Sequence, residues 1–229
     1  MKKLALLFYL LLWLVSEASA QCTNPYYNFK QGMLLEMTSF DSKGKITSKT
    51  ISEIKSVAKS GNGLNADIDF RLIDDKGNDI SSGSYQIKCN NGVLQIDVSR
   101  MIPQESLQVF KDMEATIEMT ELQLPSDLQV GSSLPDASFM MKTQSDQMPM
   151  TFTFDIVNRK VESKESITTS AGTFECFKIT YDVNSKIVFA NTKMKGVDYV
   201  AKGVGTVKTE TYKSNGKIAG YTQLTKFEE

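Results

Sequence analysis

Hydrophobic and polar residues alternate with a period of two along much of the chain. In residues 66–73 the side chains of Ile68, Phe70 and Leu72 fall on one side, and charged residues fall between them. The same alternation occurs in four other segments, which are residues 46–57, 84–88, 93–98 and 151–157. Successive side chains of a β-strand point to opposite faces of a sheet, so this pattern predicts antiparallel strands with one polar face.

Short turns that contain glycine separate these segments. They occupy residues 41–45, 74–78, 90–92 and 214–217. Each combines glycine with Asp, Asn, Ser or Lys, a composition typical of turns between neighbouring antiparallel strands. The turn at 74–78 is rich in carboxylates, but its spacing differs from that of an EF-hand calcium loop, so we interpret it as a solvated hairpin tip. The chain is therefore predicted to be all-β and built from hairpins.

One segment departs from the strand pattern. Leu107, Phe110 and Met113 recur at helical spacing, and Pro103 suits the first turn of a helix because its missing N–H has no helical partner there. We predict one short inserted helix over 103–113. Residues 124–135, which contain two prolines and a glycine, are predicted to form a loop that joins two halves of one sheet.

The first twenty residues have the pattern of a secretory signal peptide. Lys2 and Lys3 form a basic head, Leu4–Val15 is a continuous apolar run, and Ala18-Ser19-Ala20 fits a signal peptidase site. The apolar run is shorter than the roughly 20 residues of a membrane span. We predict a signal peptide at 1–20 and a single β-rich domain at 21–229, exported to the periplasm or secreted, with no transmembrane span.

Three cysteines would then enter an oxidising compartment. Gln21 precedes Cys22, whereas a lipoprotein signal has a small residue there, so lipid anchoring is not expected. Cys89 lies at a strand end before the turn at 90–92, where a disulfide to Cys22 could form. We favour the Cys22–Cys89 disulfide, although spacing alone leaves Cys89–Cys176 open. Cys176 lies within a predicted strand and is expected to be a small buried hydrophobic residue.

Composition restricts the possible chemistry. The chain has no histidine, which excludes Ser-His-Asp and Cys-His nucleophiles and histidine-bound metals. Its formal net charge is −1 and no basic tract occurs, so nucleic acid is not an expected partner. We predict no cofactor and no metal. Catalysis by paired carboxylates, such as Glu118 with Glu121 or Glu162 with Glu165, stays open as a hydrolase alternative.

A glycine motif near the C-terminus could be mistaken for a phosphate-binding loop. Gly203 and Gly205 precede Lys208, but residues 206–212 are β-branched and aromatic, which favours a strand and not the helix that such a loop needs. If Asn215-Gly216 is a two-residue turn, Lys208 lies opposite Gln223 in a hairpin. The glycines then mark a bend in the sheet.

Methionines are numerous in the middle of the chain. Met140, Met148 and Met150 share parity with Phe152 and Phe154, which predicts one continuous apolar face across a long hairpin. These five residues are the candidate site for a lipid-like ligand. Packing of the core and binding of Cu(I) by thioethers are the alternatives.

Several stretches resemble a known family. The sequence is similar to the TapB-like group, related to the domain-of-unknown-function family 3108, whose members are typically envelope proteins of Gram-negative bacteria with no assigned reaction. The matching stretches are NPYYNFKQG (24–32), SFDSKGKIT (39–47), VGSSLPDAS (130–138), ESITTSAGTFECFKITYD (165–182) and YVAKGVGTVKTETYKSNGK (199–217). The resemblance implies a strongly curved antiparallel sheet or open half-barrel, and it supplies no catalytic residues.

Together these observations predict an exported cell-envelope protein that is not an enzyme. Its apolar concave face is expected to bind an apolar small molecule or another envelope protein. One alternative is a structural or assembly protein that pairs through an exposed β edge, for which the last hairpin at 204–227 is the candidate. The other is the carboxylate-based hydrolase. The sequence leaves the oligomeric state open.

Overall fold

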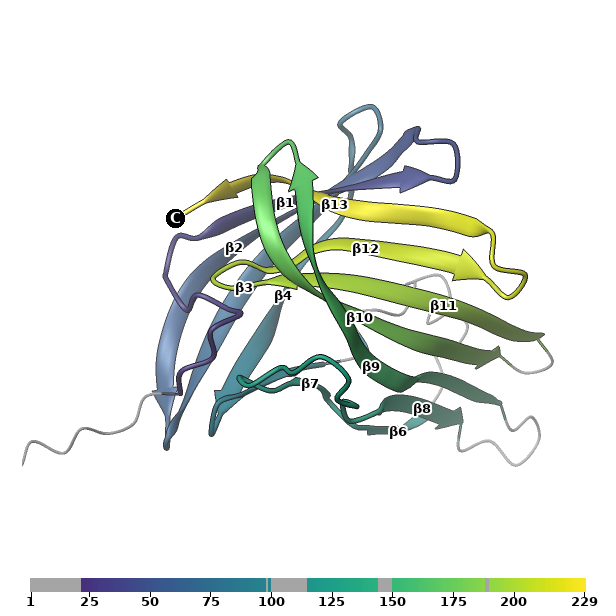
Figure 1. The fold of residues 1–229 in the computed structure, drawn as a ribbon. Helices are drawn as coiled ribbons and strands as arrows, with labels where there is room; N and C mark the ends of the chain where they lie inside the picture. The colour runs from purple at the N-terminus through teal and green to yellow at the C-terminus, as the bar shows by residue number, and fades with distance from the viewer. Residues whose placement is uncertain (1–21, 98, 100–114, 144–149, 188–189) are drawn as a thin grey trace, which may run out of the picture.

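The structure, a computed structural model, describes residues 22–97, 99, 115–143, 150–187 and 190–229. Thirteen strands in these residues form one antiparallel sheet, which confirms the predicted all-β fold (Figure 1). The helix expected over 103–113 lies outside the described residues. Within them, no helix is long and apolar enough to cross a membrane.

The strands follow one another as hairpins along most of the chain. The predicted turns at 41–45, 74–78, 90–92 and 214–217 each connect neighbouring strands. The strand bounds are β1 Leu34–Asp41, β2 Ile46–Ser60, β3 Gly63–Asp74, β4 Asp79–Asn90, β5 Val93–Ile96, β6 Ala115–Met119, β7 Leu122–Leu124, β8 Ala137–Thr143, β9 Thr151–Thr169, β10 Gly172–Ile187, β11 Ala190–Ala201, β12 Gly205–Lys213 and β13 Ile218–Glu228.

The two ends of the chain meet in the middle of the sheet. The strand order is β6-β8-β9-β10-β11-β12-β13-β1-β2-β3-β4-β5-β7, so β1 pairs with β13. The edge strands are β6 and β7, which follow one another in the chain and leave the sheet open. The prediction of an exposed edge at 204–227 is wrong, because β12 and β13 are paired on both sides.

The sheet is strongly curved, and one hairpin bends across its neighbours (Figure 1). The tip of β9–β10 reaches β13, where Ser170 Oγ donates a hydrogen bond to the Thr225 carbonyl at 3.2 Å. Phe174 from this tip packs against a buried cluster that includes Val207 and Leu224, both 0% exposed. The curvature agrees with the open half-barrel that the family resemblance implies.

One face of the sheet carries most of the core, and we call it the inward face. Directly paired residues share a face, and following the pairs from β10 to β2 places Ile179 and Ile54 on the same side. Two segments outside the strands cover part of this face. In residues 22–33 the side chain of Tyr26 is buried, and in 125–136 Leu128 and Leu134 join the same apolar cluster.

Candidate functional site

Three of the five residues predicted to bind a ligand form part of the packed core. Met150, Phe152 and Phe154 are 8%, 1% and 6% exposed. Phe139 of β8 packs against Phe152 with ring centroids 5.9 Å apart. Met148 lies outside the described residues. The described part of this region is filled by its own side chains, so a ligand there would have to displace them.

Met140 does not share a face with the phenylalanines. It lies opposite Thr153, while its neighbour Met141 lies opposite Phe152. Met140 is half-buried on the outward face, and Met141 is 6% exposed on the inward face. The prediction that Met140 shares a face with Phe152 and Phe154 is therefore wrong. The face on which a residue lies depends on the register between β8 and β9, which the numbering of the residues does not reveal.

A different region of the inward face carries apolar side chains that are not fully covered. It spans β1–β3 and β12–β13, and we call it the open patch. Its residues are half-buried and combine apolar with hydroxyl side chains: Leu35, Met37, Ser39, Thr50, Ser52, Phe70, Leu72, Thr209 and Thr222. Cross-strand rows hold them in register, as in the pairs Met37–Thr50 and Thr50–Leu72.

A row of polar side chains runs through the open patch and continues beyond it. Thr209 lies opposite Thr222, which lies opposite Ser39, and the hydroxyls of Ser39 and Thr222 are 2.9 Å apart. The row continues to Asp198 on β11, whose Oδ1 accepts hydrogen bonds from Thr209 Oγ1 at 2.7 Å and Tyr181 OH at 3.2 Å. Polar atoms therefore lie in line beside the apolar residues.

Burial changes the acidity of the groups around Asp198. Loss of water raises the pKa of Asp198, against the lowering effect of its two hydrogen-bond donors and of the Arg159 charge. Burial likewise raises the pKa of Tyr181 and lowers that of Arg159. Arg159 is 4% exposed and donates through one nitrogen to the carbonyls of Gln123 at 2.9 Å and Pro135 at 2.6 Å. This guanidinium therefore holds the loop before β8 against β9.

Three of the four carboxylates considered for hydrolysis form ion pairs with lysines, and Glu121 does so with Lys88 at 3.2 Å. Glu162 and Glu165 pair with Lys160 and Lys178, each at 3.2 Å. Asp155 also has a pKa raised by burial, but it projects from the face of β9 opposite to its buried neighbours, whereas Asp198 is on the inward face. Within the described chain no group of three or more His, Cys, Asp or Glu side chains is placed to hold a metal ion.

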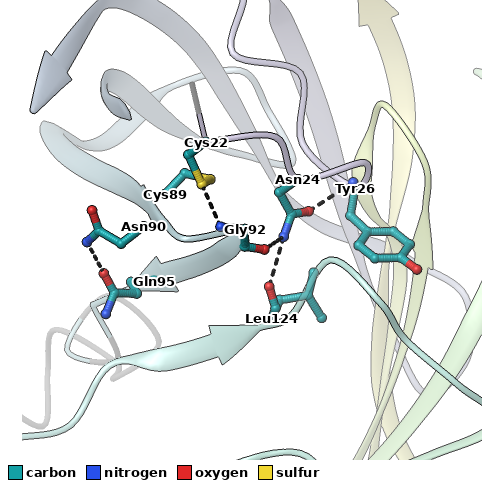
Figure 2. The surroundings of a disulfide bond; sticks show 8 residues. All are labelled: Cys22, Asn24, Tyr26, Cys89, Asn90, Gly92, Gln95 and Leu124. Carbon is teal, nitrogen blue, oxygen red and sulfur yellow. Dashed lines mark hydrogen bonds between the residues drawn. A yellow bond between two sulfur atoms is a disulfide. The ribbon is translucent and has the colours of Figure 1, made fainter. Parts of the chain in front are cut away.

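The predicted disulfide between Cys22 and Cys89 is confirmed (Figure 2). It joins residues whose Cα atoms are 5.7 Å apart and anchors the N-terminal segment to the end of β4. Next to it, Asn24 Nδ2 donates to the carbonyls of Gly92 at 2.9 Å and Leu124 at 3.0 Å. Asn24 Oδ1 accepts from the Tyr26 amide at 3.0 Å. Cys176 is free and buried, as predicted.

The N-terminal segment also meets the glycine motif. Gly203 donates from its amide to the Pro25 carbonyl at 2.7 Å, and both Gly203 and Gly205 have positive φ angles of 75° and 88°. Lys208 lies opposite Gln223, as predicted, and its ammonium contacts Glu210 at 2.6 Å. The glycines therefore form the bend into β12, where a side chain would be strained.

Comparison with known proteins assigns the fold. A family model described as DUF3108-like matches residues 30–224. A crystal structure of a protein described as exported, with a YmcC-like fold, from Bacteroides fragilis NCTC 9343, superposes with a TM-score of 0.73. It is 15% identical and covers 90% of this chain and 100% of its own. The chain matches no curated protein sequence.

A second crystal structure has the same architecture. It is described as a lipoprotein from Parabacteroides distasonis ATCC 8503 and superposes with a TM-score of 0.70 at 22% identity. It covers 90% of this chain and 99% of its own. At these identities the two similarities concern the fold alone.

Proposed function

The chain belongs to the DUF3108-like family, and from this premise we propose that it is a non-enzymatic, exported binding module. Its ligand is an apolar or amphipathic molecule, or an apolar segment of an envelope protein, held on the open patch. The N-terminal leader pattern and the Cys22–Cys89 disulfide support export, because disulfides persist in oxidising compartments.

The disulfide also bears on anchoring. The Parabacteroides protein is described as a lipoprotein, whereas the Cys22 sulfur of this chain is bonded to Cys89. A thiol in a disulfide is not available to carry a lipid. We therefore propose a mature chain without lipid at Cys22, and intact-mass measurement of the exported protein checks this.

The half-burial of the apolar side chains in the open patch is the observation that carries the proposal. Leu35, Met37, Phe70 and Leu72 lie on the face that forms the core elsewhere, yet they keep partial access to solvent. Covering an apolar side chain completely contributes roughly 1.5–3 kcal/mol, so a ligand that covers several of them gains substantial binding energy. The hydroxyls between them provide hydrogen bonds to an amphipathic ligand.

A single tryptophan placed in the open patch tests this proposal. The chain's one tryptophan, Trp13, lies in the predicted signal peptide, so the mature Leu72→Trp variant carries a unique fluorophore. Titration with the neutral apolar dye N-phenyl-1-naphthylamine should quench its emission by energy transfer and saturate. Ile80→Trp is the matched control, because Ile80 is 56% exposed on the neighbouring strand and does not belong to the open patch.

Equal, non-saturating quenching of the two variants would overturn the proposal. To detect a blocked site, the Thr50→Phe substitution is added to the Leu72→Trp background, because Thr50 lies directly opposite Leu72. Loss of saturable quenching in that double variant supports a site on this face. Retention of full affinity contradicts it.

A further inference from the structure

A groove lies beside the end of β11, and none of its lining residues belongs to the open patch. Its volume is about 510 Å³, which is within the range of roughly 300–1,000 Å³ common for small-molecule sites. β10 continues past β11 here, since their pairing begins at Cys176 and Ala201. The lining residues are Lys164, Thr173, Phe174, Glu175, Cys176, Phe177, Ala201 and Lys202.

The floor of the groove is apolar and firmly supported. Phe177 is 7% exposed, and its ring meets that of Tyr26 edge-on with centroids 5.9 Å apart. Cys176 and Ala201 are 1% and 3% exposed. Burial raises the pKa of the Cys176 thiol to about 11, so at neutral pH this group is uncharged. An apolar chain placed on this floor would meet no buried charge.

The rim of the groove carries unpaired positive charge. Lys164 and Lys202 are exposed, and neither forms an ion pair with a residue that the structure describes. Lys164 Nζ lies 4.7 Å from the centroid of the Phe177 ring, directly above the apolar floor. Glu175 is the one carboxylate among the described lining residues. Two ammonium groups and one carboxylate leave a formal excess of one positive charge.

We propose that this groove binds an amphiphile with a single negative charge, such as a long-chain carboxylate. The head group lies between the ammonium groups of Lys164 and Lys202, and the apolar chain lies along the Phe177 ring. The positive excess favours an anionic over a cationic head group. This site is distinct from the open patch, so the proposal does not depend on the function proposed above.

Titration with dodecanoate below its micelle concentration tests the groove, with backbone amide NMR as the readout. Dodecanoate should shift the amides of residues 173–177 and 201–202. Dodecyltrimethylammonium, which has the same tail and a positive head, should leave them unmoved. Combined Lys164→Gln and Lys202→Gln substitution should weaken dodecanoate binding by about 3- to 30-fold, the effect expected for two solvent-exposed ion pairs.

A variant of opposite sign distinguishes electrostatic recognition from simple hydrophobic adsorption. Glu175→Gln should tighten dodecanoate binding by about 2- to 5-fold, because it removes the repulsive carboxylate. Lys217→Gln, an exposed lysine in the β12–β13 turn, is the matched control and should leave the affinity unchanged. Unchanged affinity in the double lysine variant, or equal binding of the cationic amphiphile, overturns the proposal. Shifts confined to the open patch also overturn it, while leaving the proposed function intact.

Discussion

Two ends of the same strands differ in how they are covered. On β2 and β3, Ile54 and Ile68 lie opposite one another and are each 1% exposed. Four residues further along, on the same face, Thr50 and Leu72 also lie opposite one another and are only half-buried. We call the first region the packed end. The sheet is continuous through both regions, so strand pairing does not cause the difference.

The covering segments account for the difference. Residues 22–33 lie against the packed end, where Met33 is 0% exposed and its carbonyl accepts a backbone hydrogen bond from the Ile54 amide at 3.0 Å. Cys22 belongs to the same buried cluster as Ile54 and Ile68. An apolar sheet face is therefore a core where another part of the chain covers it. Where it is left partly open, it is available to a ligand.

The largest expected effect is the difference between shortening a side chain at the packed end and shortening one in the open patch. Ile68→Ala should destabilise the protein by about 2–5 kcal/mol, because it opens a cavity in a closely packed region. Leu72→Ala should cost less than about 1.5 kcal/mol, because the leucine is only half-buried. Urea unfolding followed by circular dichroism measures both. Equal losses would show that the open patch is packed as tightly as the core.

Removal of the disulfide should weaken the packed end next. Replacing Cys22 and Cys89 by serine should lower the free energy of unfolding by about 2–4 kcal/mol, because a link spanning 67 residues no longer restricts the unfolded chain. A reductant should lower the melting temperature of the wild-type protein towards that of the double variant, whose own melting temperature stays constant. A wild-type protein indifferent to reductant would contradict the assigned disulfide.

Loss of the Asn24 side chain should have a smaller effect. Asn24→Ala leaves the Gly92 and Leu124 carbonyls and the Tyr26 amide without this partner, at an expected cost of about 1–3 kcal/mol. Asn28→Ala is the matched control, because the Asn28 amide makes an exposed hydrogen bond to Glu229. Hydrogen exchange should accelerate in residues 22–33 of the Asn24 variant only. Similar exchange in the two variants would show that the Asn24 side chain does not hold the N-terminal segment in place.

The smallest expected effect concerns Asp198 at the border of the open patch. Its pKa is raised in the folded state, so the folded protein holds this proton more tightly than the unfolded chain. The stability it contributes is complete below the unfolded value of about 3.9 and is lost as the pH rises through the folded value. The Asp198→Asn variant has no carboxyl group to titrate here, so it lacks this loss of stability with rising pH. Urea midpoints for both proteins between about pH 4 and 7 should therefore diverge as the pH rises; parallel curves would contradict the raised pKa.

Local features of the fold could be predicted from the sequence because they depend on neighbouring residues. Glycine turns located the hairpins, and the partner of Lys208 was predicted from the β12–β13 turn. The connection is nevertheless a four-residue turn, residues 214–217, compensated by an irregularity between Thr211 and Tyr212. The predicted pairing of Lys208 with Gln223 is therefore correct, although the turn is two residues longer than predicted.

Two kinds of feature could not be predicted from the sequence, which are β-bulges and pairings between strands far apart in the chain. Val57 lies opposite Ala66 and Ile54 opposite Ile68, because a bulge between Ile54 and Ser56 reverses the alternation of β2. The pairing of β1 with β13 joins the two ends of the chain, and no local pattern marks it. The open patch depends on that pairing, so its half-covered state was not visible in the sequence.

Methionine methyl groups provide the most direct measurement, since they report from both kinds of region at once. Met37 lies in the open patch, while Met33 and Met141 are 0% and 6% exposed in the core. The protein with ¹³C-labelled methionine methyls is titrated with dodecyl maltoside below its micelle concentration. This amphiphile is neutral, so the groove beside Lys164 and Lys202 does not favour it. If the open patch binds the ligand, the Met37 methyl shifts saturably while Met33 and Met141 stay unmoved. A shift at Met141 with Met37 unmoved would place binding in the β8–β9 core and contradict it.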